Sequence, residues 1–152
     1  MNKSGVTPME TTYISEEPDD TRRFAEALFQ QFGPGKIWAL HGDLGAGKTC
    51  LIQGLALALG VREPVTSPTF ALVHEYEGTV PLIHLDLYRL SGPEDILALG
   101  WDDYMESPGI VAVEWAERAS GLFPAGTLHI DIQMDARKYR RIFRVCERSE
   151  PS

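Results

Sequence analysis

The feature that most constrains this chain is a glycine-rich segment between an apolar strand pattern and a helical pattern. The segment, Gly42-Asp43-Leu44-Gly45-Ala46-Gly47-Lys48-Thr49, matches the pattern Gly-x-x-x-x-Gly-Lys-Thr at every defined position. Residues 36–41 form the strand pattern that leads into it, and the helical pattern that follows ends at Gly60. A loop of this type in this context is typical of α/β proteins that bind the phosphates of ATP or GTP with Mg²⁺. A glycine-rich turn that arose by chance is the weaker alternative, because both flanking patterns are present.

Each defined position of this segment has a mechanical reason. The glycines at 42, 45 and 47 let the backbone turn with its N–H groups inward, where a side chain would block a phosphate. The following helix directs its positive end at the same anion. Lys48 is expected to reach the terminal phosphates, and the Thr49 hydroxyl is expected to ligate Mg²⁺. The nucleotide contacts are therefore predicted at Asp43, Leu44, Gly45, Ala46, Gly47, Lys48, Thr49 and Cys50.

Two acids end apolar strand patterns and are candidates for the metal site. Asp86 follows the apolar stretch 81–85, and Glu114 follows 110–113. Ligand crevices of α/β proteins lie at the carboxyl ends of strands, and Mg²⁺ takes one or two carboxylates while it keeps several waters. Either acid alone is also consistent with capping a loop or a helix. The residues leave open which acid contacts the metal and which orients the attacking water.

Strand and helix patterns alternate along the chain, which favours a parallel-dominated sheet covered by helices on both faces. We predict one α/β domain over residues 1–152, of the P-loop NTPase type, with antiparallel edge strands from a closing hairpin and loose tails at about 1–10 and 149–152. The strand patterns cover residues 11–14, 36–41, 71–76, 80–87, 109–114, 128–133 and 139–146, and the helical patterns run from about 15 to 32, from the glycine-rich segment to 60, and from 93 to 99.

The charge distribution bears on partners. The formal net charge of -8 opposes direct binding to nucleic acid. Residues 137–148 nevertheless hold six arginines and lysines and one acid, Glu147. A solvated edge strand is one interpretation of this basic segment, and a local anion or partner site is the other. No apolar run approaches the roughly 18 residues that span a bilayer, and no secretory signal is apparent, so a cytoplasmic protein is expected.

Four motifs stand in one order along the chain, and together they resemble the TsaE family, the bacterial ATPase of tRNA threonylcarbamoyladenosine biosynthesis. The resemblance covers roughly residues 15–144, and it is the combination of motifs that makes it specific. The motifs are Gly42 to Thr49, Ser67-Pro68-Thr69-Phe70, His84-Leu85-Asp86-Leu87-Tyr88-Arg89 and Glu114-Trp115-Ala116-Glu117-Arg118.

The resemblance implies a weak, Mg²⁺-dependent ATPase that acts with a partner threonylcarbamoyltransferase complex of TsaD and TsaB type and meets tRNA only through that complex. It implies that Thr49 and Glu114 are Mg²⁺ ligands and that Asp86 supports the metal and water. It also implies that Thr69 senses the terminal phosphate and that Trp115 lies near the nucleotide or the partner. Cys50 stands where many relatives carry a second threonine. The implied catalytic residues are Lys48, Thr69, Asp86 and Glu114.

Other polar residues of these motifs have plainer interpretations. His84 shares a strand face with Asp86, which is more typical of a packing or supporting histidine than of a base. Arg89 and Arg118 follow the two acids, and structural ion pairs are the plainer interpretation for both. Trp115 is also consistent with a core position.

Two further functions remain open. A small-molecule kinase would use the same loop, although no long insertion offers an arginine-bearing lid. A nucleotide-dependent binding module would need ATP for assembly but not its hydrolysis. The choice of adenine over guanine rests on the resemblance, together with the lack of a guanine-reading Asn-Lys-x-Asp stretch in the sequence.

Overall fold

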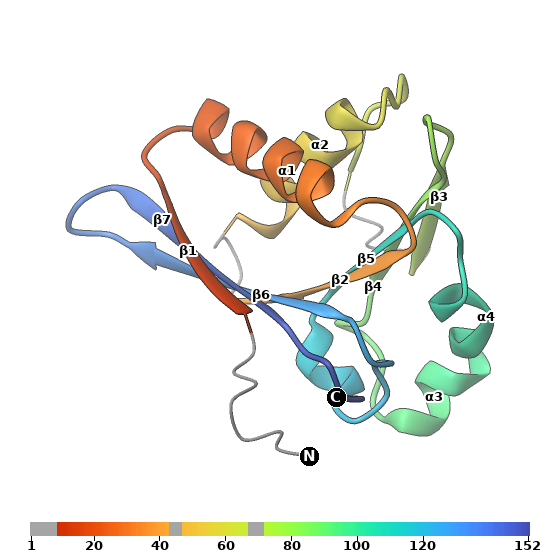
Figure 1. Cartoon of the computed structure of the whole chain (residues 1–152). Coiled ribbons are helices and arrows are strands. Elements are labelled where there is room, and N and C mark those ends of the chain that lie inside the picture. Colours follow the sequence, from red (N-terminus) through yellow and green to blue (C-terminus); the bar gives the residue numbers. More distant parts are fainter. Residues whose placement is uncertain (1–8, 43–46, 67–71) are drawn as a thin grey trace, which may run out of the picture.

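A computed structural model of the chain, described over residues 9–42, 47–66 and 72–152, contains one seven-stranded mixed sheet. The strand order is β1-β7-β6-β2-β5-β4-β3, as Figure 1 shows. The strands are β1 (Met9–Ser15), β2 (Lys36–His41), β3 (Val73–Tyr76), β4 (Leu82–Asp86), β5 (Ile110–Glu114), β6 (Leu128–Asp135) and β7 (Arg140–Glu147). The helices are α1 (Pro18–Phe32), α2 (Lys48–Ala58), α3 (Pro93–Ala98), α4 (Trp101–Met105) and the 3₁₀ helix η1 (Ala116–Ala119).

The centre of the sheet is parallel and both sides are antiparallel. Strand β2 pairs in parallel with β5 and β6, and β4 pairs in parallel with β5. Strand β3 pairs antiparallel with β4, whereas β7 lies antiparallel between β6 and β1. The predicted α/β fold with antiparallel edge strands is confirmed. Its antiparallel part is larger than the closing hairpin predicted, because β1 joins β7 and β3 joins β4.

Helices cover the two faces of the sheet, and each face buries its own core. On one face, α1 and α2 pack together over a cluster that includes Trp38, Leu55 and Ala112. On the other face, a second cluster includes Val113 and Ile96 of α3. Successive residues of β5 alternate between the two clusters, as the geometry of a strand requires. The fully buried pattern of this central strand follows from cover on both sides.

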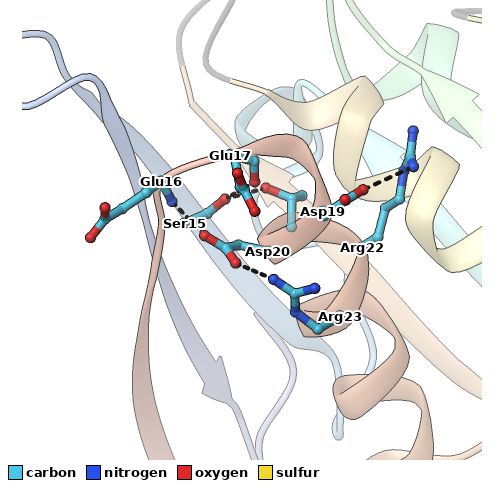
Figure 2. Close-up of polar contacts among 8 residues, drawn as sticks. Ser15, Glu16, Glu17, Asp19, Asp20, Arg22 and Arg23 are labelled. Carbon is cyan, nitrogen blue, oxygen red and sulfur yellow. Dashed lines mark hydrogen bonds and ion pairs between the residues drawn. The ribbon is translucent and has the colours of Figure 1, made fainter.

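Figure 2 shows how the turn between β1 and α1 is held. The Ser15 hydroxyl lies 2.7 Å from the Thr21 hydroxyl and donates to the Glu17 carbonyl. The Glu16 N–H donates to the Asp20 carboxylate, and this bond, with help from Arg23, holds the pKa of Asp20 below its usual value. Acids in the first turn of this helix therefore help to fix the chain entering α1.

Both expected tails are partly wrong. Residues 9 and 10 belong to β1, where they pair with Glu147 and Cys146 of β7. At the other end, the Ser152 N–H donates to the Phe123 carbonyl, and the Gly121 N–H donates to the carbonyl of Ser152. These backbone pairings hold segments that the sequence pattern left without a partner. Helices α4 and η1 were not predicted, because five and four residues are too few to show a helical period.

Within the described residues, no helix is both long and apolar enough to cross a membrane.

The contact between Gly109 and the β3–β4 connection provides a stability test. A Cβ at Gly109 would lie 2.0 Å from the Pro81 carbonyl oxygen, and that oxygen also accepts the Ile110 N–H. We expect Gly109→Ala to lower the free energy of unfolding by about 2–3 kcal/mol, measured by urea denaturation. The control is Gly92→Ala, since a Cβ there has no described neighbour within 4 Å; its cost should stay within about 0.5 kcal/mol. Equal stability of the two variants would contradict this packing.

Candidate functional site

The glycine-rich segment joins the end of β2 to the start of α2, in the strand–loop–helix context that the sequence predicted. Gly47 precedes α2 in a left-handed conformation with φ of 109°, which favours glycine. Helix α2 then begins at Lys48 and carries Thr49 in its first turn. The predicted contacts at Asp43, Leu44, Gly45 and Ala46, and the predicted switch residue Thr69, lie outside the described residues.

Lys48 is buried at this junction, with only 4% of its surface exposed. Its Nζ donates a 2.7 Å hydrogen bond to the Gly42 carbonyl, which joins the residue after β2 to the first residue of α2. The same Nζ lies 3.9 Å from the ring centre of Trp115. The ammonium is therefore held between a carbonyl dipole and an aromatic face, both of which stabilise a cation. This places the positive charge beside the N-terminus of α2, where an anion also finds favourable N–H groups.

Trp115 belongs to this site rather than to the core alone. It follows Glu114 at the end of β5 and has left-handed backbone angles, φ 58° and ψ 44°, which are uncommon for a bulky residue. Its half-buried ring packs 4.8 Å from the Tyr88 ring, and the Arg118 guanidinium lies over Tyr88. The Arg118 guanidinium also donates to the Leu90 carbonyl, so its described contacts hold together the loops after β4 and β5.

The two candidate acids are neighbours at the carboxyl ends of two adjacent strands, β4 and β5. Asp86 and Glu114 are register partners in the parallel β4–β5 pair. Alternation along β5 places Glu114 on the face of Ala112, which is the face that α2 covers. The same alternation along β4 places His84 and Asp86 on that face. The Glu114 carboxylate is buried and accepts a 2.6 Å hydrogen bond from Nε2 of His84. The half-buried Asp86 carboxylate accepts from the Tyr88 N–H at 2.9 Å.

The donor chemistry of these residues fits magnesium. Thr49 offers a hydroxyl, and Asp86 and Glu114 offer carboxylates, all of them hard oxygen donors. Among the described residues, no group of three or more acidic, histidine or cysteine side chains gathers around one point to cage an ion. Mg²⁺ does not require such a cage, because it keeps several waters and binds through one or two carboxylates and the phosphates of its nucleotide.

Arg141 of β7 is a site residue that sequence reasoning did not single out. A Cβ at Gly47 would lie 2.5 Å from Nε and 2.6 Å from Cδ of Arg141, so this side chain covers the start of α2. Its Nε is buried and has no hydrogen-bond partner among the described residues. Alternation along β7 could have placed Arg141 on the face of the buried Phe143, but its position beside Gly47 depends on the strand order.

The basic segment thus divides into residues with different environments. The edge-strand interpretation is wrong, because β7 lies between β6 and β1. Arg144 points to the other face from Arg141 and donates to the Gln133 side chain at 2.8 Å. The interpretation as a local anion site fits Arg141, whose guanidinium lies beside the phosphate-loop motif.

A pair of histidines lies on the opposite side of the same strand end. His41 Nε2 is 2.9 Å from His129 Nδ1, and His129 Nε2 is 2.7 Å from the Ser152 hydroxyl. Their rings stack at the edge of a cavity of about 430 Å³ that Phe123 and Arg148 also line. The sequence suggested no constellation for these histidines, because the two are 88 positions apart. Burial lowers the pKa of both, and that of His129 falls to about 4 with a further contribution from His41.

A known family matches this chain over most of its length. The model of the family described as Threonylcarbamoyl adenosine biosynthesis protein TsaE matches residues 15–142. A Treponema pallidum protein named tRNA threonylcarbamoyladenosine biosynthesis protein TsaE is 37% identical over 129 residues, covering 85% of this chain and 96% of that protein. Its namesake in Haemophilus influenzae is 39% identical over 139 residues, covering 87% and 88% of the two chains. A third, from a Nostoc species, is 48% identical over 113 residues, or 71% and 69%.

One solved structure has the same fold. The crystal structure of Bacillus subtilis YdiB superposes with a TM-score of 0.76 and 31% sequence identity. The match covers 94% of this chain and 88% of that chain.

The histidine pair predicts a loss of stability in acid. Folding keeps His129 neutral down to about pH 4, whereas the unfolded chain takes up the proton near pH 6.5. Stability is therefore complete above about pH 6.5 and falls between pH 6.5 and 4, by at most about 3 kcal/mol for this residue. Urea denaturation of wild type and His129→Gln across this range measures the difference. The variant should lose less stability than wild type, and parallel pH curves would contradict the assignment.

Proposed function

Because the chain belongs to the TsaE family, we propose that it is an Mg²⁺-dependent ATPase that serves threonylcarbamoyladenosine modification of tRNA. The observation that carries the proposal is the position of Lys48, buried at the junction of β2 and α2 with its ammonium against Gly42 and Trp115. A buried ammonium at the N-terminus of a helix, with a pair of strand-end acids nearby, is an arrangement suited to a nucleoside triphosphate and its metal.

Binding uses the cations around the start of α2. A phosphate there accepts from the backbone N–H groups of the helix, and Lys48 exchanges its bond to the Gly42 carbonyl for a bond to a phosphate oxygen. Arg141 provides a second cation from β7, and its buried Nε, which has no hydrogen-bond partner among the described residues, gains an acceptor. The Trp115 ring, 3.9 Å from the ammonium, shields the lysine from water and so strengthens its interaction with the phosphate.

Hydrolysis uses the oxygen donors at the carboxyl ends of the strands. Thr49 and Glu114 would hold Mg²⁺, with Asp86 supporting its water shell, and the ion would supply charge neutralisation at the phosphates. A water oxygen attacks the γ-phosphorus, and the bond from that phosphorus to the β–γ bridging oxygen breaks to give ADP and inorganic phosphate. Lys48 and Arg141 stabilise the negative charge that develops on the phosphate oxygens.

The partners belong to the same proposal. A chain with a net charge of -8 is poorly suited to hold tRNA by itself, so the tRNA is bound by a threonylcarbamoyltransferase complex of TsaD and TsaB type. Phosphate release should therefore be measured on the chain alone and then with the partner complex and tRNA. Transfer of labelled phosphate to a small acceptor would favour the kinase alternative. Normal tRNA modification by a hydrolysis-dead Glu114→Gln variant would favour the binding-module alternative.

Lys48 provides the first test of the phosphate site. Loss of its charge-assisted bonds, each worth roughly 1.5–3 kcal/mol, should weaken ATP binding by about 10-fold to 100-fold in Lys48→Ala. Isothermal titration calorimetry with ATP and Mg²⁺ measures this loss, and the melting temperature shows whether the variant is folded. Unchanged affinity in a folded variant would contradict the proposed site.

Arg141 provides a second test with a matched control on the same strand. Arg141→Met should weaken ATP binding by about tenfold, since it removes a charge beside Gly47. Arg144→Met removes an equal charge from the opposite face of β7 and should leave the affinity unchanged. Equal losses in the two variants would show that the net charge, rather than the position of Arg141, is what matters.

A further inference from the structure

His84 is a buried histidine whose place in the fold calls for an explanation. Its side chain is completely buried on β4, and its Nε2 lies 2.6 Å from Oε2 of Glu114. In the parallel register, His84 pairs with Ala112 and Asp86 pairs with Glu114. The histidine therefore lies two residue pairs deeper in the sheet than the two acids, on the same face, and supports Glu114 from beneath.

We propose that His84 is the positioning residue for Glu114, and that it sets the affinity of the site for Mg²⁺. This inference rests on the proposed function, because it assumes that Glu114 is a metal ligand. The Nε2–H donates to Oε2 and restrains a side chain that otherwise rotates about three bonds. With Oε2 held by the histidine, Oε1 is the oxygen assigned to the metal. Partners behind a ligand commonly fix its orientation and raise its basicity in this way.

The small side chain at position 112 lets the contact form. Ala112 lies on β5 between the strands that carry Trp38 and His84, in register with both residues. All three side chains point to the α2 face, where Ala112 leaves room for the imidazole to turn toward Glu114. The alternation that positions the acids thus also aligns the donor behind one of them.

The second ring nitrogen argues against a purely packing role. Nδ1 of His84 is buried and has no hydrogen-bond partner in the part of the chain that the structure describes. An unsatisfied buried nitrogen costs stability, and an apolar side chain of similar volume would avoid that cost. The bond from Nε2 to Glu114 is the one described contact of the ring that requires a histidine, so the residue type is explained by what it does to that carboxylate.

Two amide substitutions separate donation from volume. In His84→Gln, the amide nitrogen reaches the place of Nε2 and keeps the donor to Glu114. In His84→Asn, the shorter amide places its nitrogen near Nδ1 and loses that donor. His84→Met fills the site with no donor at all. The control is His74→Met, since His74 is the register partner of His84 on β3 but bonds to the Tyr76 hydroxyl instead.

The experiment measures ATP affinity of the full chain by calorimetry, in a titration of Mg²⁺ and again in EDTA. His84→Met and His84→Asn should need about 10-fold to 100-fold more Mg²⁺ for half-maximal strengthening of ATP binding. Their ATP affinity in EDTA should stay within about twofold of wild type, because the phosphate contacts are intact. His84→Gln should recover most of the Mg²⁺ response, and His74→Met should match wild type.

Each other outcome overturns something specific. A wild-type Mg²⁺ response in folded His84→Asn overturns the positioning role, and so does an equal loss in His84→Gln and His84→Asn. Loss of ATP affinity in EDTA as large as the loss with Mg²⁺ shows a merely structural role and also overturns it. If His84→Met does not fold, the comparison of Gln with Asn decides alone. Wild-type protein whose ATP binding does not respond to Mg²⁺ contradicts the proposed function instead.

Discussion

The parallel register of β2, β5 and β4 is the constraint on which the candidate site depends. Leu40 pairs with Glu114, and Glu114 pairs with Asp86, so one row of the sheet aligns the end of β2 with both acids. The chain leaves that row through the glycine-rich segment and enters α2. Since neighbouring strands are about 4.8 Å apart, backbone hydrogen bonds alone align the carboxyl end of β2, from which the chain leads to α2, with the two acids. A shift of one residue in either pairing would turn an acid to the other face.

The antiparallel side of the sheet adds a cation, Arg141 of β7, to the candidate site. Strand β7 lies between β6 and β1, so it is not an edge strand. One face of it packs in the same core cluster as α2. The same alternation that buries Phe143 and Val145 aims Arg141 at Gly47 and turns Arg144 away. A chain with a strongly negative net charge thereby adds one cation of this hairpin to Lys48 at the place where an anion is expected to bind, while basic residues elsewhere on the hairpin have local partners or face solvent.

The parts of this site that the sequence predicts are those that lie within one contiguous segment of the chain. The strand, loop and helix around Lys48 are contiguous, and Asp86 and Glu114 each end their own apolar strand, so local patterns suffice for them. Three contacts join residues that are far apart in the sequence, and they depend on strand order and register. They are the contact of Arg141 with Gly47, the His41–His129 pair, and the bond between His84 and Glu114. Single-sequence patterns carry no information on strand order or register. Alternation did predict the shared face of His84 and Asp86, but the partner of His84 proved to be Glu114.

The hydrogen bonds of Lys48 and the two acids also bear on the rate of ATP hydrolysis that the proposed function would allow. Lys48 bonds to Gly42, Glu114 to His84, and Asp86 to the Tyr88 N–H. Under the proposed function, a nucleotide must exchange the lysine's bond for its own, and the net gain of such an exchange is far smaller than the bond itself. Trp115, which has left-handed backbone angles and contacts both Lys48 and Tyr88, links that exchange to an exposed aromatic ring. A partner that contacts the loops after β4 and β5 would then alter the lysine's surroundings through one stack of side chains, which is a physical route by which the proposed ATPase would depend on the proposed complex.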